Sequence, residues 1–213
     1  LEAVKTEVRA LEERLRNADH KPFTFQFHPW WNYSGTIAYL ETAMELDRQL
    51  KAAGIEKAHI YVVAGHTHAG LQLGGKLLGR PWKVTGISVS SYTYYPDAIP
   101  GWCDGVAQEV GLPTSLRKEE LEVDFAYQGT YGVPTPECIE AIKLAARTEN
   151  LILDPVYTGK CMAGLIDHIH KGKAKPSETV VFMHTGGTPL IFQYAQELSS
   201  DLVRHTSVNQ LPT

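Results

Sequence analysis

The sequence predicts an α/β protein with an open, mainly parallel sheet that carries helices on both faces. Two successive strand–helix units support this class. Residues 23–27 alternate as a strand does and precede a helical pattern over 36–53, and the apolar run 59–64 precedes a helix from Ala69 to about Gly79. Consecutive units of this kind place their strands in parallel and their helices on the faces of the sheet.

The other elements are predicted from the spacing of apolar residues and from the glycines and prolines that end them. An opening helix has apolar residues along one face and stops before Lys21-Pro22. Glycine, proline and apolar spacing then predict the rest of the chain: strand 83–89, a short helix 106–111, strand 121–125, a helix from Pro136 to about Asn150, a helix ending at His170, strand 179–183, a helix through Leu198 and a polar tail from Ser199.

Composition narrows the class of protein. The chain has 213 residues, of which 43% are hydrophobic, so it can bury a sizeable core. A net charge of −4 and a pI near 6.1 disfavour nucleic acid and anionic membranes as partners, and favour small molecules or other copies. No apolar run approaches a membrane span, the first residues do not resemble a signal peptide, and the three cysteines are widely spaced. We therefore expect a cytoplasmic protein with free thiols.

The segment around Gly65 and Gly70 predicts an anion site. It follows a buried strand, contains small and hydroxyl-bearing residues, and leads into a helix whose first N–H groups point outward with partial positive charge. The segment matches neither the dinucleotide fingerprint nor the nucleotide P-loop. A small phosphate ester is the ligand that this pattern favours.

Four polar loops are expected at one edge of the sheet. Loops that follow parallel strands lie at the carboxyl edge, where open α/β folds bind their ligands. The loops concerned are 28–35, 64–70, 127–134, and 155–160 together with 184–188.

Motifs in these loops resemble the D-cysteine desulfhydrase and 1-aminocyclopropane-1-carboxylate (ACC) deaminase family. This is a pyridoxal 5'-phosphate (PLP) group of fold type II, the fold of the tryptophan synthase β-subunit. The resemblance covers nearly the whole chain and rests on four ordered motifs: Thr67-His68-Ala69-Gly70-Leu71, Tyr131-Gly132-Val133-Pro134, residues 154–160 with 162–167, and His184-Thr185-Gly186-Gly187.

The resemblance implies a set of site residues. Tyr131 and Tyr157 match the family's two active-site tyrosines, and Thr185 stands where desulfhydrases place a hydroxyl against the pyridine nitrogen. Thr158 replaces a glutamate of the deaminase branch, which favours the desulfhydrase reaction, D-cysteine to pyruvate, sulfide and ammonia. The implied cofactor-binding residues are Ala64, Gly65, His66, Thr67, Thr158 and Thr185.

The chain departs from the family in two segments. Residues 30–35 are bulkier than the family's loop of small residues, so substrate size is expected to differ. The family's Schiff-base lysine has no counterpart, because Lys160 belongs to a different motif. We expect the chain to be the C-terminal portion of a homodimeric lyase or deaminase and inactive alone, with the lysine on a missing N-terminal half or a companion chain. The expected parts are a small-domain helix (1–20), the large PLP domain (21–198) and a tail (199–213).

Three alternatives stay open at this stage. The complete protein can be an ACC deaminase, or the chain can be a non-catalytic subunit that binds PLP or phosphate, since the lysine is absent. A metal site at His66 and His68 is the third, although their spacing in a turn and the lack of a nearby acidic ligand disfavour it.

Overall fold

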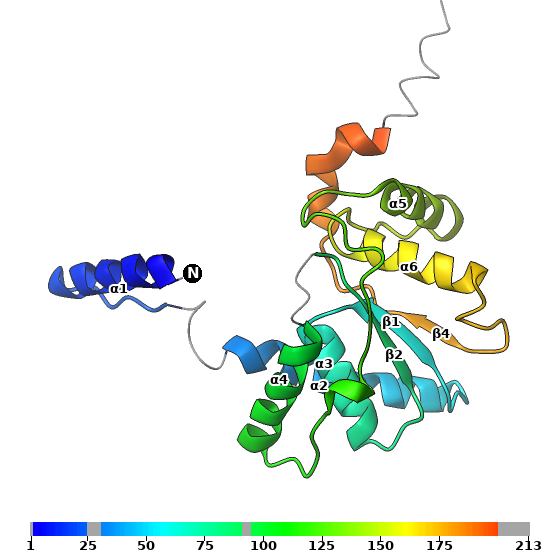
Figure 1. Cartoon of the computed structure of the whole chain (residues 1–213), viewed down its shortest axis with the longest axis horizontal. Coiled ribbons are helices and arrows are strands. Elements are labelled where there is room, and N and C mark those ends of the chain that lie inside the picture. The colour runs from blue at the N-terminus through cyan, green and yellow to red at the C-terminus, as the bar shows by residue number, and fades with distance from the viewer. Residues whose placement is uncertain (1, 25–30, 91–94, 200–213) are drawn as a thin grey trace, which may run out of the picture.

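A computed structural model describes residues 2–24, 31–90 and 95–199 of the chain (Figure 1). Its sheet has four strands: β1 (His59–Val63), β2 (Lys83–Ile87), β3 (Glu122–Asp124) and β4 (Val180–Phe182). The strand order is β3-β2-β1-β4, and all three pairings are parallel. The predicted α/β class is confirmed.

Helices cover both faces of this sheet, α3 with α2 on one face and α6 with α5 on the other (Figure 1). Of two short 3-10 helices, η1 precedes β3 and η2 follows β4. The bounds are α1 (Glu2–Asn17), α2 (Trp31–Ala52), α3 (His66–Leu77), α4 (Tyr95–Val110), η1 (Lys118–Glu120), α5 (Pro136–Glu149), α6 (Thr158–His170) and η2 (Thr188–Tyr194).

The two faces follow from the alternation of side chains along the strands. Ile60 and Val62 of β1 pack with Val84 of β2 in a core shared with α2 and α3. Tyr61 and Ile87 point to the opposite face, in a core with α6. Strands buried on both sides in this way are mostly apolar, which is why residues 60–64 form a continuous apolar run after the buried His59.

Close packing of α2 on α3 depends on glycine. A Cβ at Gly70 would lie 2.4 Å from the backbone oxygen of Thr36, and one at Gly74 would lie 2.3 Å from the Cβ of Ala43. The backbones of the two helices therefore approach directly along this contact, which fixes the beginning of α3 relative to Thr36.

Turns at the amino edge differ from loops at the carboxyl edge. The connections that precede β1, β2 and β4 each contain a glycine with positive φ, at Gly54, Gly79 and Gly172, and each has open space where a Cβ would stand. The carboxyl edge instead holds the loops that carry the predicted site residues.

Several predicted boundaries need correction. The loop expected over 64–70 is shorter, because α3 begins at His66 and not at Ala69; burial of His68 against the sheet favours helix there. The loop expected over 28–35 is helical from Trp31, since Gly35 and Thr36 pack on His66 of α3, and residues 28–30 lie outside the described part.

Two further segments also differ from the prediction. The helix expected over 106–111 is the end of the longer α4, whose Ile99, Cys103 and Val106 are buried on one side although Pro100 lies inside the helix. Phe23 and Thr24 are not in a strand, and the remainder of the strand predicted over 23–27 is not described. The segment after Gly187 begins as the 3-10 helix η2, which Pro189 opens.

Within the described residues, no helix combines the length and the apolar content that a bilayer span requires. The amphipathic α1 buries none of its residues. The division of the chain into parts at residues 20 and 198 stays a prediction.

Candidate functional site

The start of α3, where the sequence predicts an anion site, lies open at the carboxyl end of β1. Gly65 is the N-cap, with φ 145° and ψ −148°, and no side chain caps the helix. Nothing lies within 4 Å of the place that a Cβ of Gly65 would occupy. The first N–H groups of a helix lack partners inside it, so the N–H groups after Gly65 face a space that a phosphate can fill.

His66 lies beside this position and is held by two neighbours. Its Nδ1 is 3.1 Å from the hydroxyl of Thr36, which is buried in α2. Its ring stacks on Trp102 of α4 at a centroid distance of 3.9 Å. Burial lowers the pKa of His66, so the ring is neutral near pH 7 and acts as a packed wall of the site.

His68, in contrast, points into the core. Its ring fills the space beside Gly86 of β2, where a Cβ would lie 2.4 Å from Nδ1. Burial lowers the pKa of His68 to about 4. His66 and His68 thus point to different surroundings, and no cluster of three metal-ligating side chains exists among the described residues.

The start of α6 is organised by Asp154. This carboxylate is fully buried and accepts hydrogen bonds from the backbone N–H groups of Val156, Tyr157 and Thr158 at 2.7 to 2.9 Å. The hydroxyl of Thr158 donates to the same carboxylate at 2.6 Å and accepts from the N–H of Asp154. Because the Thr158 hydroxyl is engaged within this turn, its predicted contact with the cofactor stays a prediction.

The loop that contains Thr185 packs against the same turn. Gly187 has φ 82°, and a Cβ there would lie 2.6 Å from Oδ2 of Asp154. His184 binds the carbonyl of Ile152 through Nε2 at 2.9 Å. Since Met183 donates its N–H to the carbonyl of Tyr61, the loop after β4 lies next to the end of β1. Half-buried Thr185 is thereby placed at the same edge as Ala64 to Thr67.

Tyr131 and Tyr157 meet across two loops. Their hydroxyls are hydrogen-bonded to each other, and their rings lie edge to face at a centroid distance of 5.9 Å. Tyr131 is half exposed, so the pair borders solvent at the carboxyl edge. Tyr194 secures the loop from the other side by donating to the carbonyl of Gly132 at 2.5 Å.

Lys160 is a buried cation that sequence reasoning assigned no function. Its Nζ donates to the carbonyls of Val89, Gln128 and Thr130 at 3.1, 2.6 and 2.9 Å. Burial lowers the pKa of this amine. These carbonyls come from two segments distant in sequence, and backbone acceptors leave no residue signature, so no motif could have revealed the contact.

The residues of this edge fit a small phosphate ester with a polar ring. The anion position after Gly65 is open, and the segment 64–70 contains no acidic side chain. Two buried oxygens at the same edge, Ser90 Oγ after β2 and Gln128 Oε1 after β3, have no hydrogen-bond partner within the described part of the chain. The Ser90 hydroxyl can donate to a phosphorylated ligand, whereas Gln128 Oε1 can only accept a hydrogen bond.

The fold is that of an α/β protein whose polar loops gather at the carboxyl edge of a parallel sheet, where such folds bind ligands. The family model described as pyridoxal-phosphate dependent enzyme matches residues 2–186. The chain therefore belongs to the pyridoxal-phosphate dependent enzymes. The resemblance seen in the motifs and the predicted cofactor are confirmed at this level.

Three solved structures are similar to this chain, and the first of them agrees with this assignment. A structure described as an ACC deaminase homologue is 29% identical, with a TM-score of 0.76, and the match covers 93% of this chain and 59% of that chain. A fungal L-serine ammonia-lyase from Rhizomucor miehei (14% identity, TM-score 0.48) and threonine deaminase isoform 2 from Solanum lycopersicum (17%, 0.49) match over 76% of this chain, and over 55% and 48% of their own lengths. The chain spans less than two thirds of these proteins.

Proposed function

We propose that this chain supplies the cofactor-binding half of a PLP-dependent lyase that converts D-cysteine to pyruvate, sulfide and ammonia. The observation that carries the proposal is the hydrogen-bonded pair of phenols, Tyr131 and Tyr157, at the sheet edge that also bears the anion position. A phenol can hydrogen-bond a substrate carboxylate or move a proton, and a pair can do both.

When bound, PLP supplies an electron sink that weakens bonds at the amino acid's α-carbon. In the proposed site, the N–H groups after Gly65 bind its phosphate and Thr185 donates or accepts at its ring nitrogen. A neutral partner leaves the ring less electron-withdrawing than a carboxylate partner would. Tyr131 and Tyr157 then orient the substrate and hold the proton at a phenol oxygen.

The covalent attachment of the cofactor needs a lysine other than Lys160. The Nζ of Lys160 is buried and fully engaged with three carbonyls, so it is not available for that bond. We propose that the attaching lysine comes from outside these 213 residues, in the same protein or on a companion chain. This chain by itself is then expected to be inactive.

The ACC deaminase reaction is the second candidate, favoured by the likeness to an ACC deaminase homologue. The replacement of the deaminase branch's glutamate by Thr158 favours D-cysteine instead. A non-catalytic PLP-binding subunit is the third candidate, and it also follows from the unavailability of Lys160.

The deciding experiment takes the protein isolated with every chain that accompanies it. Borohydride reduction and intact mass locate a covalent pyridoxyl adduct, and D-cysteine and ACC are then assayed in parallel for sulfide and ammonia. We expect an adduct outside this chain, and equal amounts of sulfide and ammonia from D-cysteine. Ammonia from ACC without sulfide from D-cysteine would establish the second candidate, and PLP binding without adduct or turnover would establish the third.

A further inference from the structure

One side of α6 supports the whole loop that carries Tyr131. The contacting positions on α6 are spaced by three, four and three residues, which places them on a single helix face. They meet the loop in reverse order of sequence: Tyr157 contacts Tyr131, Lys160 binds the carbonyls of Thr130 and Gln128, Gly164 lies under the ring of Tyr127, and Asp167 accepts from the Tyr127 hydroxyl.

Lys160 occupies the centre of this row and also reaches the sheet. Its third carbonyl partner is Val89, two residues beyond the end of β2. An ammonium group has three N–H donors and no acceptor, so the three carbonyls use its full capacity. Because each carbonyl requires a donor, the charged form of Lys160 is the form that fits this geometry.

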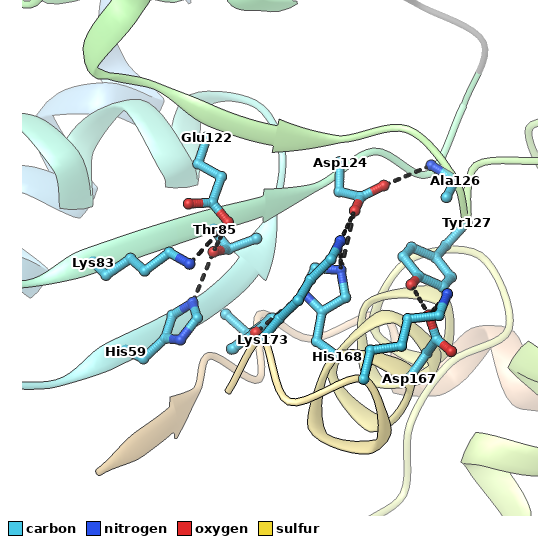
Figure 2. Close-up of polar contacts among 12 residues, drawn as sticks. His59, Lys83, Thr85, Glu122, Asp124, Ala126, Tyr127, Asp167, His168 and Lys173 are labelled. Carbon is cyan, nitrogen blue, oxygen red and sulfur yellow. Dashed lines mark hydrogen bonds and ion pairs between the residues drawn. The ribbon is translucent and has the colours of Figure 1, made fainter. Parts of the chain in front are cut away.

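The helix that carries Lys160 is itself fixed to the sheet at its other end. Figure 2 shows His168, two residues before the end of α6, between the sheet and Lys173. The Nδ1 of His168 lies 3.1 Å from the Tyr61 hydroxyl, and Nε2 lies 3.0 Å from Asp124 Oδ2. The face of α6 that meets the loop is therefore a rigid support, and the loop takes its position from it.

We propose that Lys160 is a positioning residue whose ammonium group clamps residues 128–130 and thereby places Tyr131 against Tyr157. The importance of this placement for catalysis rests on the proposed function. The clamp itself rests on the contacts of Lys160 alone. Without the ammonium group, the carbonyls of Val89 and Gln128 lose its hydrogen bond, and that of Thr130 keeps the N–H of Val133. Tyr127 and Tyr194 then hold the two ends of the loop.

The test measures the Tyr131–Tyr157 approach directly. Photo-oxidation of the full chain with ruthenium tris-bipyridyl and persulfate couples neighbouring tyrosines with loss of two hydrogens, and peptide mass spectrometry locates the product. We expect Lys160→Met to lower the yield of the Tyr131–Tyr157 cross-link roughly ten-fold. The rate of a reaction between two groups in contact falls steeply when one of them is displaced by about 1 Å. Lys51→Met removes an exposed ammonium group from α2 and leaves its buried partner Asp47 paired with Arg80, so it is the matched control and retains the full yield.

Two additional variants separate positioning from general destabilisation. Lys160→Ala removes the propylammonium portion of the side chain, so added propylammonium should restore the cross-link. Gly129→Ala disturbs the backbone of the loop between the two clamped carbonyls, since Gly129 has φ 53° and a Cβ would lie 3.1 Å from Thr135 Cγ2 and 3.8 Å from Lys160 Nζ. It should lower the cross-link even if Lys160→Met does not fold.

Each outcome has a defined meaning. A folded Lys160→Met chain with the wild-type cross-link yield overturns the proposal. In the complete enzyme, we expect Lys160→Met to lower kcat for D-cysteine roughly ten-fold with KM changed less than about three-fold, as for a group that acts on orientation. If the cross-link falls while kcat is unchanged, the clamp stands and the proposed function of Tyr131 fails.

Discussion

Gly187 lies so close to Asp154 that a Cβ at residue 187 would be 2.6 Å from the carboxylate oxygen Oδ2. The same residue has φ 82°, a conformation that side-chain-bearing residues rarely adopt. The position of the Thr185 loop is thus set by direct contact with the carboxylate that organises the start of α6.

Replacing Gly187 is expected to be costly for two reasons that act together. Gly187→Ala adds backbone strain and overlap with Asp154, so we expect a loss of roughly 3 kcal/mol in the free energy of unfolding by urea titration. Gly54→Ala is the control, because Gly54 also has positive φ but has open space, and it should lose only about 1 kcal/mol. Equal losses in the two variants would show that the contact with Asp154 contributes nothing.

Replacement of Asp154 by asparagine, which differs only in its amide group, is expected to be destabilising. Its carboxylate accepts from three backbone N–H groups and from one hydroxyl, and an amide in its place must direct NH₂ at some of these donors. We expect Asp154→Asn to lower the free energy of unfolding by roughly 3 kcal/mol. Asp97→Asn, at an exposed ion pair with Lys118, should leave it unchanged within error. An unfolding midpoint for Asp154→Asn equal to wild type would contradict this account.

The buried His68 predicts acid sensitivity. Its pKa is near 6.5 in the unfolded chain and about 4 in the folded chain, so below pH 6.5 only the unfolded state takes up the proton. Stability is complete above about pH 7 and falls as the pH drops toward 4. The expected loss between pH 7 and pH 5 is about 2 kcal/mol, measured by urea unfolding.

The control variants are compared by the slope of the free energy of unfolding against pH, and not by their stability at one pH. His68→Met removes the titrating group and should flatten the pH dependence, whereas His20→Gln changes an exposed histidine and should retain it. Burial also lowers the pKa values of His59 and His66, so a smaller slope of the same sign should remain in His68→Met. If the slope in His68→Met equals that of the wild type, His68 is not the main source of the pH dependence of stability.

The α2–α3 contact gives a fourth prediction. A Cβ at Gly70 would overlap the Thr36 carbonyl at 2.4 Å, so Gly70→Ala must separate the helices and should lower the free energy of unfolding by about 3 kcal/mol. Gly101→Ala in α4 has open space and should be neutral or stabilising by roughly 0.5 kcal/mol. Thermal unfolding of both variants is the measurement, and similar melting temperatures would contradict the expected overlap.

Sequence patterns predicted the elements whose burial is regular. The apolar run of β1, the proline that opens α5 and the glycine after α2 each act locally. The structure has β1, α5 and the end of α2 where expected. The length of α4 was not predicted, because Pro100 and Gly101 weaken its local pattern and burial of Ile99 and Cys103 overrides them.

The candidate site was predictable only in part for a similar reason. Tyr131 and Tyr157 are 26 positions apart, and only the family motifs suggested that they act together. Three of the four hydrogen bonds accepted by Asp154, and the carbonyl partners of Lys160, depend on backbone groups, which every residue has. Contacts of that kind become visible only when the chain is folded.

The glycine turns at the amino edge have a practical consequence for handling this protein. Gly54, Gly79 and Gly172 lie at the end of the sheet opposite the ligand loops, with empty space around them. Surface turns of this type accept inserted peptides well. An affinity tag, a fluorescent label or a tether for surface immobilisation placed after Gly54 should therefore leave cofactor and substrate measurements undisturbed, whereas one after Gly172 would displace Lys173 from His168 and Asp124.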